Sequence, residues 1–161
     1  YGDALILGIN NVNTKYFCIF NADGSFNPNE LENMYKKAND QCCDFIFGSR
    51  YMKGASSEDD TITTFIGNKI FSYAGKKIFS LPISDILYTY VLGDTEKTKK
   101  LNLKQKSFSF CIELPILAKR HNNILMSTPS NERKRIAGQK KVSAFKDGFI
   151  ILINMIKIFF K

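Results

Sequence analysis

The stretch YFCIFNADGS, residues 16–25, decides the fold class. Its first five residues are apolar or aromatic, which is typical of a strand buried in a sheet. A single acid, Asp23, follows within three residues, and Gly24 and Ser25 complete a turn. Because a charge at the end of a buried strand is costly without a partner, the stretch predicts a ligand-binding carboxylate, with an ordinary Asp-Gly turn as the alternative.

The neighbouring segments extend this strand into an α/β domain. Residues 28–39 carry apolar side chains at helical spacing, and residues 43–51, CDFIFGSRY, form a second apolar run that ends at Gly48. Strand, helix and strand in this order predict an α/β fold with a parallel sheet. Ligands of such sheets bind at the carboxyl ends of the strands, where both Asp23 and the segment Gly48-Ser49-Arg50 fall.

Further elements are expected along the rest of the chain. We expect helices over 2–13, 61–79 and 142–161, a strand over 86–93 with a short helix after it, a helix within 107–121 and a strand over 123–130. Gly148 should break the last helix, and Pro115 obscures the start of the helix within 107–121. Residues 148–161 are apolar on nearly every side but shorter than the ~18 residues of a spanning helix. They predict a buried terminal helix or a helix in a membrane interface, and the basic residues before them favour the membrane surface.

Composition narrows the chemistry. The 161 residues are 44% hydrophobic, which is enough for one domain with its own core. The four cysteines lack C-x-x-C spacing and His121 is the only histidine, so a Cys/His zinc site and a disulfide framework are not expected. Any metal should be a hard cation held by oxygen. The opening residues do not resemble a signal peptide and lack Met, so we expect a cytoplasmic chain that is a piece of a longer protein.

Charge is divided unevenly along the chain. Residues 1–96 hold 8 basic and 12 acidic side chains and residues 97–161 hold 15 and 3, giving formal charges of −4 and +12. This asymmetry predicts an anionic partner bound on one side. The basic segment 131–148 predicts a mobile loop that closes over an anion, with a solvated loop or a nucleic-acid patch as alternatives. No aromatic residue lies among its clustered basic residues to stack on bases, which argues against nucleic acid.

Three other residues are candidates for the site. The forked guanidinium of Arg50 matches phosphate, and Gly48 lets the backbone approach closely, although a surface ion pair is the alternative. Asp85 and Glu113 are acids flanked by apolar sequence. Each is a candidate general base or acceptor for a sugar hydroxyl, and each is equally a candidate helix cap or buried acid with satisfied bonds.

These fragments, in this order, resemble a family 2 glycosyltransferase of the dolichyl-phosphate mannosyltransferase type. The resemblance spans nearly the whole chain and rests on GDALILGI, FNADGS, NELENMYKKA, DFIFGSRY, NKIFSYAGKKIF, ISD, FCIELPILAKRH and ERKRIAGQKKVSAFKDGF. It implies a partial GT-A (Rossmann-like) sheet with flanking helices over residues 1–147 and an apolar C-terminal helix over 148–161. The family's opening strand, which holds the nucleotide base, is absent, so the chain corresponds to the C-terminal two-thirds of such an enzyme.

The resemblance also implies an inverting enzyme that transfers a sugar from a nucleotide-diphosphate sugar to a lipid-phosphate or other acceptor, assisted by Mg²⁺ or Mn²⁺. Asp23 matches the second acid of the family's Asp-x-Asp metal motif, and Asn21 stands where the first is usual. Asp85 matches the acid after the central helix, and Glu113 the glutamate that faces the acceptor. The residues matched to substrate phosphates are Ser49, Arg50, Arg133, Arg135, Lys140 and Lys141.

Two departures from the family pattern bear on function. The neutral amide of Asn21 gives a cation one charge less and should weaken its binding. Thr63 and Thr64 stand where an arginine is expected ahead of GNK, which argues against a polyprenyl-phosphate acceptor. We expect peripheral attachment at the inner face of a membrane and a role in cell-envelope glycan biosynthesis. The alternatives are an inactive glycosyltransferase-like binding module and a basic domain that binds anions or membranes.

Overall fold

The computed structural model describes residues 1–137 and 143–160. Its elements in chain order are α1 (Gly2–Asn10), β1 (Tyr16–Ile19), α2 (Glu30–Asp40), β2 (Phe45–Ser49), β3 (Ser56–Ser57), α3 (Ile62–Phe79), β4 (Val91–Asp94), α4 (Thr95–Lys100), α5 (Phe110–Arg120), β5 (Leu125–Pro129), β6 (Asn131–Glu132) and α6 (Ala144–Phe159). The predicted mixture of strands and flanking helices is confirmed, and it is consistent with a partial GT-A domain.

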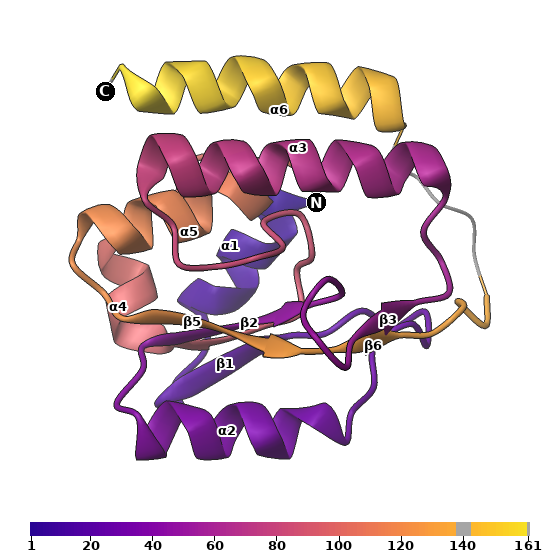
Figure 1. Cartoon of the computed structure of the whole chain (residues 1–161). Coiled ribbons are helices and arrows are strands. Elements are labelled where there is room, and N and C mark those ends of the chain that lie inside the picture. The colour runs from indigo at the N-terminus through magenta and orange to yellow at the C-terminus, as the bar shows by residue number, and fades with distance from the viewer. Residues whose placement is uncertain (138–142, 161) are drawn as a thin grey trace.

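The main sheet has the strand order β1-β4-β2-β5 within the described residues. β2 and β5 are parallel, whereas β4 runs antiparallel to both β1 and β2. The sheet is therefore mixed, whereas the sequence predicted a parallel one. The reason lies in residues 80–90, which bring the chain back along the sheet after α3 (Figure 1). β4 therefore starts beside the end of β2, with Val91 paired to Phe47.

This topology leaves β1, β2 and β5 running in one direction. Their carboxyl ends therefore meet at one edge of the sheet, where Asp23 follows β1, Arg50 follows β2 and Glu132 follows β5. The short parallel pair of β3 and β6 lies beside this edge and joins the segment after β2 to the segment after β5. The sequence did not predict that pair.

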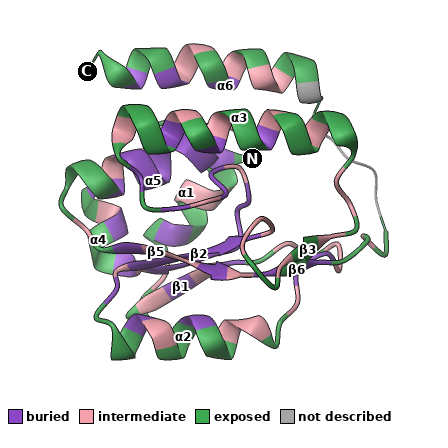
Figure 2. Cartoon of the chain, viewed as in Figure 1, coloured by how far each residue is buried: buried purple, intermediate pink, exposed green. Residues whose placement is uncertain are grey.

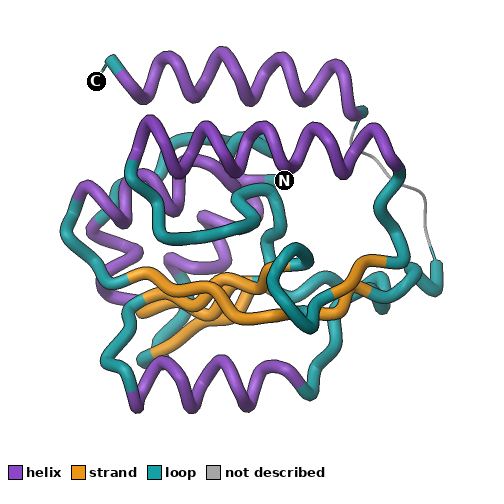
Figure 3. The backbone as a smooth tube through the Cα atoms, viewed as in Figure 1, coloured by secondary structure: helices purple, strands orange, loops and turns teal. Residues whose placement is uncertain are grey.

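The helices form layers on the two faces of the sheet. α2 covers one face, and α1, α3, α4 and α5 lie on the other, with α6 outermost beyond α3 (Figures 1 and 3). β2 is buried along its whole length because both of its faces are covered. Phe45 and Phe47 pack with the larger helical layer, while Ile46 packs with Met34 of α2 on the opposite side.

The C-terminal helix differs from its prediction. α6 continues through Gly148 without a break, so the expected interruption there is wrong. A Cβ built on Gly148 would lie 3.9 Å from the ring of Phe71 in α3, so this glycine faces the neighbouring helix.

Pro115 lies inside α5, which begins at Phe110 and is buried along most of its length. No helix among the described residues is long and apolar enough to cross a membrane.

Gly93 of β4 offers a test of the packing between β1 and β2. A Cβ there would lie 2.7 Å from the ring of Phe17 and 3.0 Å from that of Phe45, both in the core. We expect Gly93→Ala to lower the free energy of unfolding by about 1–3 kcal/mol, measured by urea denaturation, because the core is overpacked.

Gly67→Ala is the matched control, since a Cβ on this α3 residue meets nothing within 4 Å. It should raise the free energy of unfolding by about 0.5–1 kcal/mol through helix propensity. Similar losses in the two variants would contradict the described packing.

Candidate functional site

The turn after β1 presents Asp23 as a carboxylate. Its Oδ1 accepts hydrogen bonds from the backbone nitrogen of Ser25 at 3.0 Å and from the Ser25 hydroxyl at 2.6 Å. Gly24 between them has φ +83°, a conformation that suits glycine. Partial burial raises the pKa of Asp23, but the bonds from Ser25 and the charge of Arg135 outweigh it, so the net pKa is lowered. Asp23 is therefore ionised near neutral pH.

The basic segment 133–136 lies directly on this turn. The backbone nitrogens of Arg133 and Ile136 donate to the carbonyls of Ser25 and Asp23 at 2.9 and 2.8 Å. The Ile136 side chain covers Gly24 so closely that a Cβ there would be 2.6 Å from it. The late basic segment thus contacts the acid region, and its first partner there is the protein's own carboxylate.

Arg135 makes that contact. Its Nη1 lies 3.4 Å from Oδ2 of Asp23, and its Nη2 lies 3.1 Å from Oδ2 of Asp59. The Asp59 hydrogen bond, the largest influence, raises the pKa of Arg135, and partial burial opposes it. About a quarter of the Arg135 side chain is exposed, and so is a similar fraction of Asp23. The pair is accessible from solvent at the edge where the strands end.

Arg50 lies deeper and has a different environment. Its Nε and Nη2 donate to the two carboxylate oxygens of Asp85 at 2.7 and 3.0 Å. Its Nη1 lies 3.4 Å from Asp60 and 3.3 Å from Glu132, and its guanidinium stacks 4.6 Å from the ring of Tyr88. Only 7% of its side chain is exposed. Burial lowers the pKa of Arg50, but the facing carboxylates raise it by a larger amount. The net pKa is therefore raised, and the guanidinium stays charged.

The remaining residues predicted for the site are mostly engaged in buried bonds. Asp85 is fully buried with both oxygens on Arg50. Ser49, also fully buried, accepts a hydrogen bond from the hydroxyl of Ser84 at 2.8 Å. Glu113 accepts hydrogen bonds from the backbone nitrogens of residues 104 and 105 at 2.9 and 2.8 Å. These bonds anchor the segment before α5. The guanidinium of Arg133 donates to the carbonyl of Phe26 at 2.7 Å.

The structure therefore brings the predicted residues together in two pairs. Asp23 meets Arg135 at the surface of the edge, and Arg50 meets Asp85 beneath it. Glu113 instead accepts hydrogen bonds from the segment that precedes its own helix, α5. Asn21 is half-buried just ahead of Asp23. Lys140 and Lys141 lie outside the described residues.

Sequence reasoning missed three acids of this network. Asp59 and Asp60 lie between the predicted strand 43–51 and the predicted helix 61–79, and Glu132 lies in the basic segment 131–148. Tyr51 was missed as well, and its hydroxyl donates to Asp60 at 2.7 Å. The adjacent acids of SSEDDT were the available signal, because paired carboxylates just before a helix require either solvent or cations.

The donor set limits how a cation could be held. No group of three or more His, Cys, Asp or Glu side chains suited to a metal is found among residues 1–137 and 143–160. A cation held by Asp23 would therefore need most of its ligands from phosphate and water. Mg²⁺ accepts this arrangement, since it commonly binds one or two carboxylates together with substrate phosphates.

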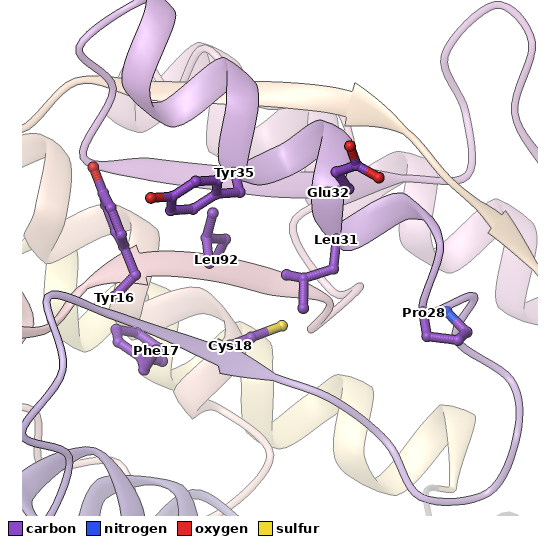
Figure 4. A pocket seen from close by; sticks show the side chains of 8 residues that line it. All are labelled: Tyr16, Phe17, Cys18, Pro28, Leu31, Glu32, Tyr35 and Leu92. Carbon is purple, nitrogen blue, oxygen red and sulfur yellow. The ribbon is translucent and has the colours of Figure 1, made fainter.

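An apolar groove of about 450 Å³ lies apart from these charged groups, between β1 and α2. Leu31 and Tyr35 of α2 face Tyr16 and Cys18 of β1 across it (Figure 4). Burial raises the pKa of the Cys18 thiol to about 12, so this thiol is neutral. None of the described residues predicted for the site lines the groove.

The match to glycosyl transferase family 2 covers residues 1–101, which is more than half of the chain and includes Asp23, Arg50 and Asp85. The chain belongs to this family. No curated protein matches the sequence. A family 2 domain indicates a glycosyltransferase, with a nucleotide-sugar donor and an acceptor. The matched region ends before Glu113 and before the segment that covers Asp23.

Arg50 allows a test of the buried network. We expect Arg50→Met to lower the free energy of unfolding by about 3–5 kcal/mol, because removing one partner leaves buried carboxylates without their counter-charge. Arg50→Lys should recover only part of this loss, since an ammonium cannot reproduce the two parallel bonds to Asp85. Chemical denaturation followed by circular dichroism measures both changes.

Arg120→Met is the control for this substitution. Arg120 is exposed at the end of α5, where it donates to the carbonyl of Phe159 at 3.5 Å and lies 5.9 Å from the ring of Phe79, so its change should stay within about 1 kcal/mol. If Arg50→Met were as mild as Arg120→Met, the buried network would not have the stabilising role described.

Proposed function

We propose that this family 2 domain transfers a sugar from a nucleotide-diphosphate sugar to a lipid-phosphate acceptor, with inversion at the anomeric carbon and with Mg²⁺ or Mn²⁺. The observation that carries the proposal is the ionised Asp23 at the carboxyl edge of the sheet, with the accessible Arg135 against it. One negative and one positive group at the same place suit a cation and a diphosphate that bind together.

In this proposal the two charges separate when the donor binds. Without substrate, Arg135 and Asp23 neutralise each other across 3.4 Å. When Arg135 turns toward a phosphate, Oδ2 of Asp23 becomes available to the cation, while Oδ1 keeps its bonds to Ser25. Asn21 would add a neutral oxygen ligand. The bound cation would neutralise the charge that develops on the departing diphosphate.

The buried acids support the choice of a phosphate acceptor. A hydroxyl acceptor needs a general base within hydrogen-bond reach. Asp85 is fully buried and held by both oxygens on Arg50, and Glu113 is buried and accepts two backbone nitrogens. A phosphate is ionised near neutral pH and attacks without a base. A single displacement of this kind inverts the anomeric centre.

Roles for the remaining predicted residues follow from the same geometry. We assign Asp85 and Ser49 to positioning, because Asp85 fixes Arg50 and Ser49 ties β2 to residue 84. Arg133 holds its segment on the turn through the carbonyl of Phe26. Lys140 and Lys141 are proposed as phosphate contacts on their charge alone. Attachment at the inner face of a membrane and a role in envelope glycan synthesis belong to the same proposal.

The assignment of Asp23 is tested by nucleotide-sugar turnover. With UDP- and GDP-sugars, Mg²⁺ or Mn²⁺ and a polyprenyl phosphate, Asp23→Asn in the full-length protein should reduce the rate by on the order of 100-fold or more, because a ligand of the cation is lost. Asp40→Asn, at the end of α2, should leave the rate unchanged. Equal rates for the two variants would rule out the assignment.

Arg135 is tested by the binding of Mn²⁺ rather than by turnover. Arg135→Gln should tighten Mn²⁺ binding in the absence of nucleotide by about two- to tenfold, because the competing cation beside Asp23 is removed. Isothermal titration or the electron paramagnetic resonance signal of free Mn²⁺ gives the affinity. Arg133→Gln should not tighten binding, since that side chain contacts a backbone carbonyl. Unchanged or weaker binding by Arg135→Gln would contradict the competition.

A further inference from the structure

The outer side of α6 carries a stripe of exposed apolar side chains. Phe145, Phe149, Leu152, Ile156 and Phe160 recur at intervals of three or four residues, which places them on one face of the helix. Phe145 and Phe160 are 82% and 81% exposed, and Phe149 is 65% exposed. A monomeric soluble protein rarely leaves such a continuous apolar face in water.

The rotation of α6 is set by contacts on its inner side. Ile151, Met155 and Ile158 are buried in the core, and the side-chain amide of Asn154 donates to the hydroxyl of Ser109 at 2.8 Å. Asn154 is one of the polar residues that interrupt the apolar sequence of α6, and this hydrogen bond directs its side chain toward the start of α5. The aromatic stripe therefore faces away from the protein as a consequence of specific packing.

α3 adds a second stripe beside the first. α6 packs along α3, with the Phe79 and Phe159 rings 6.1 Å apart, and both helices lie on the side of the molecule opposite α2 (Figures 1 and 2). Ile66, Ile70 and Tyr73 of α3 are 52%, 61% and 64% exposed, and their spacing places them on one face. We call the two stripes together the α3/α6 face.

Lysines border this face. Lys69 and Lys77 of α3 and Lys146 and Lys157 of α6 are all exposed, and helical spacing places each beside an exposed apolar residue of its own helix. Lysine is depleted from the cores of protein–protein interfaces. Lysine beside bulky apolar residues on a helix surface is, in contrast, typical of helices that lie in the interface of an anionic bilayer.

We propose that the α3/α6 face docks on a membrane that contains anionic phospholipid. The aromatic and branched side chains enter the boundary between headgroups and acyl chains, and the lysines contact lipid phosphates. This goes beyond attachment by the C-terminal helix alone, because α3 contributes three of the eight exposed apolar side chains and two of the four lysines. It does not depend on sugar transfer, since the face is formed by side chains outside the Asp23 site.

The test is co-sedimentation of the whole protein with vesicles of phosphatidylcholine, either alone or mixed with phosphatidylglycerol. The wild type should bind the mixed vesicles and lose binding as salt is raised. The double variant Phe149→Ser/Ile156→Ser should weaken binding at least about tenfold, because two inserted side chains are lost. Leu7→Ser/Ile124→Ser, at similarly exposed positions elsewhere, should bind like the wild type.

A second pair of variants tests the lysines. Lys146→Gln/Lys157→Gln should reduce binding to the mixed vesicles by about fivefold for each lysine. Lys104→Gln/Lys106→Gln, in the segment between α4 and α5, should have no such effect. Circular dichroism confirms that each variant is folded.

Two results would overturn the proposal. One is equal sedimentation of the Phe149→Ser/Ile156→Ser variant and its control. The other is a dimer, seen by light scattering without lipid, that this variant converts to a monomer, since the face would then bind a second copy of the chain. Vesicle binding is measured without nucleotide sugar, so its outcome is independent of the turnover tests.

Discussion

The ion pair between Arg50 and Asp85 is the contact on which the carboxyl edge of the sheet depends. A guanidinium that is 93% buried is stable only if carboxylates and hydrogen bonds replace its water. Here the carboxylates come from the segment before β4, the segment before α3 and the end of β6. One side chain thereby fixes three segments that are far apart in sequence. The position of the Asp23 turn relative to the rest of the edge follows from that arrangement.

The same edge shows charge used in two ways. The buried pair is shielded from water and does not need a ligand, whereas Arg135 and Asp23 share a partly exposed position. An exposed ion pair contributes little to stability, because solvent competes for both charges. The surface pair can therefore exchange partners at small cost, while the buried network keeps its geometry. A surface ion pair that can exchange partners thus lies above a buried ionic network that stays fixed.

Features that depend on a local sequence pattern were predicted from the sequence, and features that depend on contacts between distant segments were not. β1, β2 and α2 were predicted because their apolar patterns are local and are bounded by turn residues. The direction of β4 was not predicted, since it depends on the path of residues 80–90 over the sheet. The buried ion pairs of Arg50 were not predicted for a similar reason: a Gly-Ser-Arg segment at the end of a strand suits phosphate, and only the tertiary structure shows three acids around the guanidinium. The Asp23 turn was located correctly, but its contact with Arg135 joins residues 112 positions apart.

The way segment 133–136 is held bears on how fast the acid can be exposed. Two backbone hydrogen bonds attach the segment to the carbonyls of Asp23 and Ser25, and these bonds do not involve the guanidinium of Arg135. The segment can stay in place while that one side chain rotates. Rotamer changes of exposed side chains take picoseconds to nanoseconds, whereas lid opening takes microseconds or longer. Uncovering Oδ2 of Asp23 in this way requires the guanidinium to leave both Asp23 and Asp59 but requires no movement of the fold.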